Sequence, residues 1–152
     1  MPSYIDYETF RVRITGAVAR VTFDHPPINL LDDKMVGELE RFAGDAHDDD
    51  TVRVVVFDSA NPDYFIAHYD VQALLARYAA PPPRAGVLKR FHLLVERLRT
   101  MPKITIAQIE GRARGAGSEL VLSLDLRFAA LGRAILGQPE VGFQEQRRGS
   151  LR

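Results

Sequence analysis

Residues 104–129 read ITIAQIEGRARGAGSELVLSLDLRFA, and the rest of the chain is interpreted outward from this stretch. Its first six residues are mostly apolar and β-branched, which indicates a buried strand. Gly111, Gly115 and Gly117 follow among other small residues, so the backbone can approach a ligand closely there. The apolar run 119–124 then predicts the start of a helix. A strand, a small-residue loop and a helix N-terminus together present backbone N–H groups to a developing negative charge.

The composition limits the classes of function. The chain has 152 residues, of which 46% are hydrophobic, so we expect one domain, or part of one, with a sizeable core. Lys+Arg and Asp+Glu both number 20, so the formal net charge is zero and favours neither nucleic acid nor an anionic membrane as partner. Cysteine is absent, and no secretory signal or span of about 20 apolar residues is seen, so we expect a soluble cytoplasmic protein.

Alternating strands and helices are predicted along the chain. Residues 10–14 and 18–23 form a predicted hairpin, and Asp32 is a good N-cap for a helix through Ala46. Further on we predict strands at 52–57, 104–109, 126–130 and 134–136, short helices at 71–78 and 119–124, and an amphipathic helix at 87–98. This order favours an α/β fold with helices packed outside sheets. Residues 1–143 are taken as the core and residues 144–152 as a polar tail.

Glu119 and Glu140 are the carboxylates that the pattern singles out. Each follows a turn marked by Gly or Pro beside a buried strand. Two carboxylates near one reacting centre can divide the work, because one deprotonates water while the other moves a carbon-bound proton. The alternative is that each is an ordinary surface carboxylate, or a charge at a helix start. The local pattern leaves both interpretations open.

The glycine-rich loop also has two interpretations. It lacks the GxGxxG spacing of a dinucleotide site and the GK[ST] of a P-loop, so a phosphate cradle is not favoured. An oxyanion hole fits the pattern, but small residues also allow a helix to pack closely on a strand. His68 is a candidate general base or an ordinary loop histidine, and Ser118 lacks a GxSxG elbow. The histidines have no i,i+4 partner and Asp48, Asp49 and Asp50 are consecutive, so we expect no metal site.

Four stretches, in order, resemble the enoyl-CoA hydratase/isomerase (crotonase) superfamily. The signature segment of the family is matched by IAQIEGRARGAGSELVLSLDLRFA at 106–129. HPPINLLDDKMVGEL at 25–39 is similar to its early Pro-x-x-Asn segment, FIAHYDV at 65–71 to its F-x-A-G-x-D loop, and GQPEVGF at 137–143 to its G-Q-P-E turn. Together these stretches extend the resemblance over nearly all of residues 8–143.

The resemblance implies a ClpP/crotonase-like spiral of ββα units and an acyl-CoA thioester as substrate. It implies that the backbone N–H groups of Tyr69 and Ala116 polarise the thioester carbonyl, and that Glu119 and Glu140 activate water for addition to a 2,3-double bond. Isomerases of the family commonly keep only the later glutamate, so the presence of both favours a hydratase, a lyase of fatty acid metabolism. The segments expected to line the substrate and CoA side contain Ala67, Tyr69, Asp70, Val71, Gln72, Ile28 and Leu30.

The resemblance further implies no separate cofactor, since coenzyme A is part of the substrate, and a homo-oligomer, a trimer or hexamer in the family. The sequence departs from the family where His68 replaces a glycine, Ala116 a middle glycine, and Gln72 a basic residue common in other members. Family chains are longer, and the helix expected after Gly142 is replaced by FQEQRRGSLR, so the core is expected to be incomplete. An isomerase, another crotonase-type enzyme, and a non-catalytic acyl-CoA-binding remnant stay open as alternatives.

Overall fold

A five-stranded sheet forms the centre of the computed structural model, which describes residues 3–72 and 90–139. Its strands are β1 (Phe10–Thr15), β2 (Val18–Phe23), β3 (Val54–Ser59), β5 (Ile104–Ile109) and β7 (Leu126–Ala129), in the order β1-β2-β3-β5-β7. The pair β1–β2 is antiparallel and the other neighbours are parallel. The predicted hairpin is confirmed, and its turn uses Gly16 at a φ of 57°.

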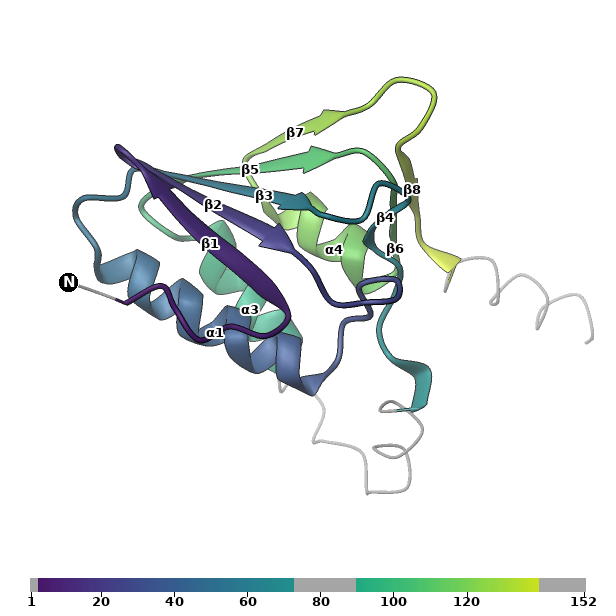
Figure 1. The fold of residues 1–152 in the computed structure, drawn as a ribbon, viewed down its shortest axis with the longest axis horizontal. Helices are drawn as coiled ribbons and strands as arrows, with labels where there is room; N and C mark the ends of the chain where they lie inside the picture. The colour runs from purple at the N-terminus through teal and green to yellow at the C-terminus, as the bar shows by residue number, and fades with distance from the viewer. Residues whose placement is uncertain (1–2, 73–89, 140–152) are drawn as a thin grey trace, which may run out of the picture.

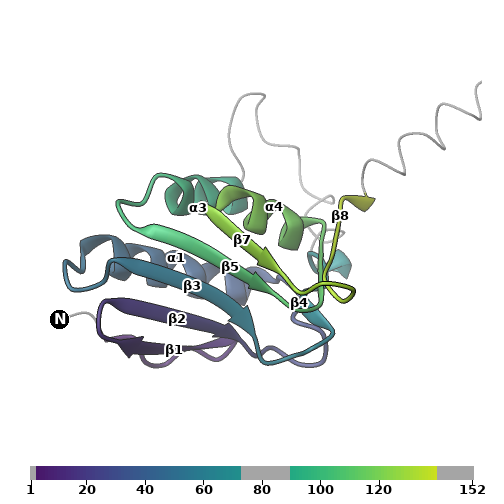
Figure 2. The same ribbon diagram turned by 90° about the horizontal axis from the view of Figure 1, so that it is seen from above.

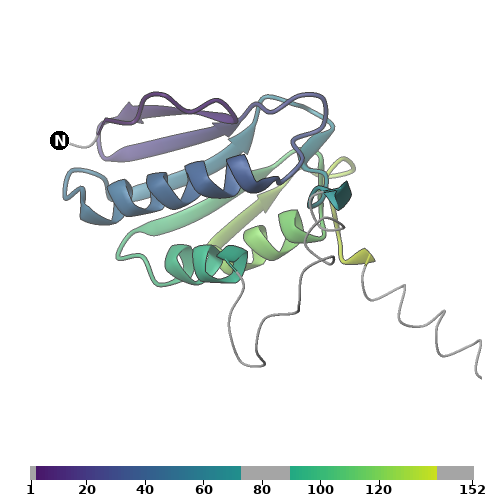
Figure 3. The ribbon, with the colours of Figure 1, turned by 90° about the horizontal axis from the view of Figure 1, so that it is seen from below.

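Among the described residues, three helices cover one face of this sheet: α1 (Asp33–Asp48), α3 (Arg90–Arg99) and α4 (Ala116–Ser123). Figure 2 shows the strands in front of the helices, and Figure 3, from the opposite side, shows the helices in front of the strands. Between the two layers lies an apolar core, whose largest fully buried side chains include Phe10, Phe23, Phe42, Phe57 and Phe65. The other face of the sheet is more exposed.

Helix α1 begins where the sequence predicts. The carboxylate of Asp32 accepts a hydrogen bond of 2.8 Å from the N–H of Met35, which satisfies one of the unpaired donors at the helix start. The predicted apolar stripe is the buried face, made by Met35, Val36, Leu39, Phe42, Ala43 and Ala46. Helical spacing of apolar residues therefore predicted both the element and the face that it buries.

A second, three-stranded sheet lies at one end of the first, next to α4 (Figure 1). It consists of β4 (Tyr64–Ile66), β6 (Arg112–Arg114) and β8 (Ile135–Gly137), in the order β4-β6-β8, and every neighbouring pair is parallel. Because the strands are parallel, the loops that follow them leave the sheet at the same edge. Tyr69 and Asp70 follow β4 at this edge, and Ala116 and Glu119 follow β6 in α4.

Some predicted boundaries are wrong. The third strand begins at Val54 rather than at residue 52, and α4 begins at Ala116 rather than after Ser118. Strands β4 and β6 occupy stretches that the sequence suggested were loops. Each is only three residues long, so no alternation of apolar and polar residues is long enough to detect.

Several predictions fall partly or wholly outside the described residues. They concern most of the short helix predicted at 71–78, the start of the helix at 87–98, and the tail 144–152. Within the described ranges, none of the helices is long and apolar enough to cross a membrane. The alternation of strands and helices confirms the predicted α/β class.

Candidate functional site

The loop between β6 and α4 is shaped by one glycine. Gly115 is the N-cap of α4, with φ of 51° and ψ of −123°, a conformation that residues with a Cβ rarely adopt. Its N–H donates a hydrogen bond of 2.8 Å to the carbonyl of Gly137 at the end of β8. The chain therefore turns sharply from strand to helix, and the N–H of Ala116 is the first of the helix. No backbone acceptor among the described residues takes that N–H.

Gly117 lets α4 lie directly against β4. A Cβ at this position would stand 2.6 Å from the carbonyl oxygen of Ile66 and 2.8 Å from its Cβ, so only glycine fits. Gly111 plays a similar part, since a Cβ there would lie 2.3 Å from the carbonyl carbon of Asp63. The close-packing interpretation of the small residues is thus correct for these two positions. The same contacts hold the N-terminus of α4 in a fixed position, so close packing and ligand binding at that N-terminus are compatible.

The loop after β4 is held by a second segment. Leu31 pairs with Tyr69 in an isolated parallel bridge. The N–H of Leu31 donates a hydrogen bond of 3.0 Å to the carbonyl of His68, and the N–H of Asp70 donates one of 2.9 Å to the carbonyl of Leu31. In such a bridge the central residue directs its own N–H and C=O to the opposite side. Tyr69 is that residue, so its N–H is directed away from Leu31. Strand β4, which precedes this loop, pairs with β6, which leads into Gly115.

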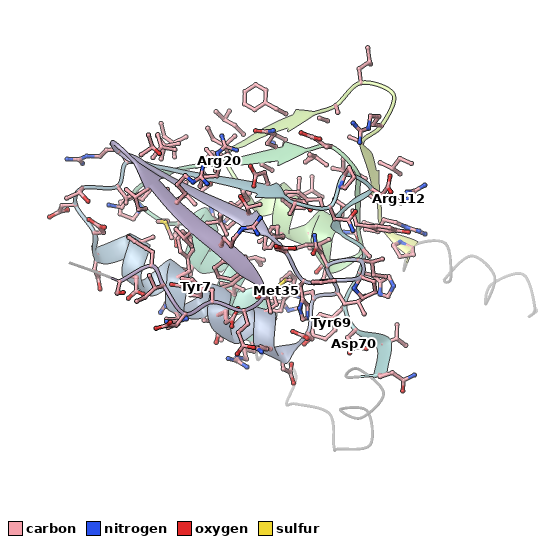
Figure 4. All side chains as sticks on the ribbon, in the orientation of Figure 1. Tyr7, Arg20, Met35, Tyr69, Asp70 and Arg112 are labelled. Carbon is pink, nitrogen blue, oxygen red and sulfur yellow. The ribbon has the colours of Figure 1, made fainter. Side chains whose placement is uncertain are left out.

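The Tyr69 ring is directed toward the helices. Its hydroxyl donates a hydrogen bond of 3.0 Å to Asp33, and its ring meets that of Phe91 edge to face at 6.5 Å between centroids. Figure 4 shows Tyr69 and Asp70 close to the N-terminal end of α1. The bulk of this side chain is therefore accommodated against α1 and α3.

Glu119 lies in the first turn of α4. Its side chain is half-buried, and no hydrogen bond or ion pair joins its carboxylate to another residue in the described parts of the chain. Its N–H donates to Gly115 at 3.0 Å. The second predicted carboxylate, Glu140, falls outside the described residues, just past the end of β8 at Gly137.

The other predicted site residues lie on the two segments joined by the Leu31–Tyr69 bridge. Ala67 is buried, and its N–H donates a hydrogen bond of 3.3 Å to the carbonyl of Ile28. Asp70 accepts a hydrogen bond of 2.8 Å from the N–H of Gln72, while the side chains of Val71 and Gln72 are exposed. Leu30, next to the bridge, is half-buried. Segments 28–31 and 67–72, which the resemblance implied to line the same side of the site, are thus neighbours although they lie far apart in sequence.

Sequence reasoning did not assign a role to Asn29. The sequence shows only a polar residue inside an apolar bend, yet the side chain is 1% exposed and its φ is 52°. Its Nδ2 lies within hydrogen-bond distance of Ser59 Oγ and of the carbonyls of Tyr64 and Phe65, at 2.9, 3.2 and 3.1 Å. Its Oδ1 accepts from the N–H of His25 at 2.8 Å. The amide thus ties the bend to β3 and β4.

His25 and Asp32 close the same bend. The Nε2 of His25 lies 2.9 Å from an Asp32 carboxylate oxygen. Burial raises the pKa of Asp32, but the hydrogen bonds from the N–H of Met35 and from His25 outweigh it, so that this pKa lies below its ordinary value. Asp32 is therefore held as a carboxylate that caps α1 and anchors the bend.

A pocket of about 400 Å³ opens on the small sheet beside this edge. It is lined by Arg112, Arg114, Ile135, Gly137, Gln138 and Pro139. The guanidinium carbon of Arg112 also lies over the Tyr64 ring, 5.5 Å from the ring centroid. The described residues contain no cluster of three or more His, Cys, Asp or Glu able to hold a metal ion. The Asp125 carboxylate accepts a hydrogen bond of 2.8 Å from the N–H of Thr105.

Comparison with known proteins assigns the family. Residues 13–145 match the enoyl-CoA hydratase/isomerase family model. The chain is 31% identical over 128 residues to the short-chain-enoyl-CoA hydratase of Clostridium acetobutylicum, covering 84% of this chain and 48% of the relative. It is 27% identical to the carnitinyl-CoA dehydratase of Escherichia coli K12 over 95% of this chain and 55% of the relative.

The fold comparison agrees. A crystal structure of a candidate enoyl-CoA hydratase from Streptomyces avermitilis superposes with a TM-score of 0.77 at 38% identity, over 90% of this chain and 51% of that one. The α/β arrangement is therefore the crotonase-like one that the resemblance implied. The chain spans about half the length of the relatives that it matches.

Proposed function

The chain belongs to the enoyl-CoA hydratase/isomerase family, and we propose that it catalyses the hydration of a 2,3-unsaturated acyl-CoA thioester. The observation that carries the proposal is the meeting of two backbone segments at the carboxyl edge of the small parallel sheet. The strained turn at Gly115 starts α4 there, and the loop with Tyr69 follows β4 at the same edge. Ligands of open α/β sheets commonly bind outside the carboxyl ends of the strands.

In the proposed reaction the N–H groups of Tyr69 and Ala116 donate hydrogen bonds to the thioester carbonyl oxygen. Water attacks C3, its oxygen forming the new C–O bond while the π electrons move toward the carbonyl and create an enolate. The two donors stabilise that oxyanion, and the N-terminus of α4 adds its positive dipole end. A proton then bonds to C2, so that one water has been added and a 3-hydroxyacyl-CoA is formed.

Glu119 and Glu140 are the proposed acid–base groups. One glutamate accepts a proton from the attacking water and the other supplies the proton to C2. The half-buried position of Glu119 in the first turn of α4, without a partner among the described residues, supports its part. Glu140 enters through the family resemblance. Coenzyme A is carried as part of the substrate, and its side of the site is proposed to include segments 28–31 and 67–72.

The test is an absorbance assay of the conjugated thioester of a short 2-enoyl-CoA. Saturation of the double bond removes that absorbance, and Glu119→Gln is expected to lower the rate by about 100-fold or more. Glu110→Gln is the matched control, because Glu110 is exposed and precedes β6. A Glu119→Gln rate equal to wild type would contradict the assignment. Binding of the thioester without turnover would instead favour a non-catalytic acyl-CoA-binding role.

Homo-oligomeric assembly and a cytoplasmic location form part of the same proposal, on the strength of the resemblance. Sedimentation velocity would test the first, since a species of monomer mass alone would refute it. Cell fractionation would test the second.

A further inference from the structure

The Asn29 side chain uses its hydrogen-bonding capacity inside the protein. Its amide faces Ser59, Tyr64 and Phe65 on one side and accepts from His25 on the other, and it is almost fully buried. A buried amide with satisfied donors and acceptor fixes the position of the backbone on which it stands. No atom of this side chain is exposed enough to be offered as a substrate contact. Its influence therefore passes through its neighbours.

Those neighbours hold the loop after β4. Ile28, which precedes Asn29, accepts from the N–H of Ala67 at 3.3 Å, and Leu31 forms the bridge to Tyr69. Asn29 thus stands between two residues whose backbone forms hydrogen bonds with segment 67–70. Its own side chain forms hydrogen bonds with β4, just before that segment. Hydrogen bonds of residues 28, 29 and 31 therefore join the bend to residues 64–70. A movement of the bend would be transmitted to Tyr69.

We propose that Asn29 is a positioning residue that aims the Tyr69 N–H at the thioester carbonyl. This inference rests on the proposed function for the identity of the ligand. The side chain holds the bend to Tyr64 and Phe65, the bend holds Leu31, and the Leu31 bridge sets the direction of the Tyr69 peptide. Oxyanion stabilisation depends on donors that are already oriented, so a small rotation of this peptide weakens it.

Two substitutions separate the role of the amide from that of the turn. Asn29→Gly keeps a residue that tolerates a φ of 52° but removes the side-chain hydrogen bonds. Asn29→Asp keeps the acceptor for His25 and replaces the donor group by an oxygen that faces two carbonyls. Val52→Ala is the control for general loss of stability, because Val52 is buried and lies two residues before β3 begins, whereas Ser59 is the last residue of that strand.

The readout is the absorption band of bound cinnamoyl-CoA, a thioester whose conjugated system shifts to longer wavelength when its carbonyl is polarised. Wild-type protein is expected to produce the red shift, and both Asn29 variants to lose most of it while still binding the thioester. The hydration kcat should fall by about 10- to 100-fold, with a far smaller change in KM. Val52→Ala should keep both the red shift and kcat. Circular dichroism checks that each variant is folded.

The outcomes separate this inference from the proposed function. A full red shift in both Asn29 variants, or none in the wild type, would overturn the positioning role. A red shift in the wild type that the variants lose, without hydration by any of them, would support the positioning role and refute the proposed reaction. Should neither Asn29 variant fold, Ser59→Ala removes a single partner of the amide. A reduced red shift in Ser59→Ala would support the inference, and an unchanged one would overturn it.

Discussion

Replacing Gly117 by alanine should displace the N-terminus of α4. The added Cβ would stand 2.6 Å from the Ile66 carbonyl oxygen, whereas ordinary contacts begin at 3.4 Å, so helix and strand must separate by about 0.8 Å (3.4 − 2.6). The obstacle is backbone, which cannot rotate away as a flexible side chain can. Overpacking of this kind costs about 1–3 kcal/mol, or roughly 2–4 °C in Tm per kcal/mol for a chain of this size.

The same displacement should affect the proposed chemistry. Ala116 precedes Gly117, so its N–H moves with the helix end by a large part of the 0.8 Å. A misplacement of about 1 Å can lower a rate about 100-fold, and we expect Gly117→Ala to lower kcat by about 10- to 100-fold. Thermal unfolding followed by circular dichroism measures the first effect, and the enoyl-CoA assay measures the second.

Gly44→Ala is the matched control for this substitution. Gly44 lies inside α1, where a Cβ would stand 3.7 Å from the nearest atom, an Arg97 guanidinium nitrogen. Alanine there should raise stability by up to about 1 kcal/mol, because glycine is a poor helix former. The two glycine-to-alanine changes are thus expected to have opposite signs. A Gly117→Ala protein with wild-type Tm and wild-type kcat would refute the reasoning, since it would show that α4 does not depend on this contact.

Three further outcomes are expected. Burial raises the pKa of Glu38, but hydrogen bonds from the Thr9 hydroxyl and from backbone N–H groups lower it by more, so that this pKa lies below its ordinary value of 4.5. The stability that the Glu38 carboxylate contributes should therefore be lost as pH falls below about 4.5. Glu38→Gln should flatten that pH dependence in denaturant titrations. Thr105→Val should cost about 1–3 kcal/mol of unfolding free energy, because the buried hydroxyl exchanges two hydrogen bonds with Asp125. Phe128→Thr, at a side chain 61% exposed on the edge strand β7, should change stability by less than about 0.5 kcal/mol and reduce binding of a hydrophobic dye.

The elements that sequence predicted well are those whose signals are local. Helix α1 has an N-cap and an apolar stripe, and the β1–β2 hairpin has alternation on both sides of a glycine turn. The glycine-rich loop and Glu119 could be singled out because strand, loop and helix start are contiguous. These features need only interactions between residues close in sequence, which periodicity and capping rules describe.

The elements that it missed depend on contacts between distant parts of the chain. Strand β4 is three residues long and forms because β6 pairs with it from about fifty residues later. The Asn29 partners at Ser59, Tyr64 and Phe65 lie 30, 35 and 36 residues away in sequence. Nothing in the local pattern around Asn29 specifies those partners. A polar residue in an apolar bend is a signal that it needs a partner, but it does not say which one.

Strand β4 connects the two parts of the candidate site, and this has a measurable consequence. The Asn29 amide bonds to the carbonyls of Tyr64 and Phe65, and Gly117 packs on the next residue, Ile66. If Asn29→Asp loosens β4, the strand can yield to the new methyl group of Gly117→Ala. The cost of that methyl group should then be smaller in the double variant, with a coupling of about 0.5 kcal/mol or more in unfolding free energy. Strict additivity would mean that the two contacts hold the loop and the helix independently, and that β4 does not link the positions of the two N–H groups.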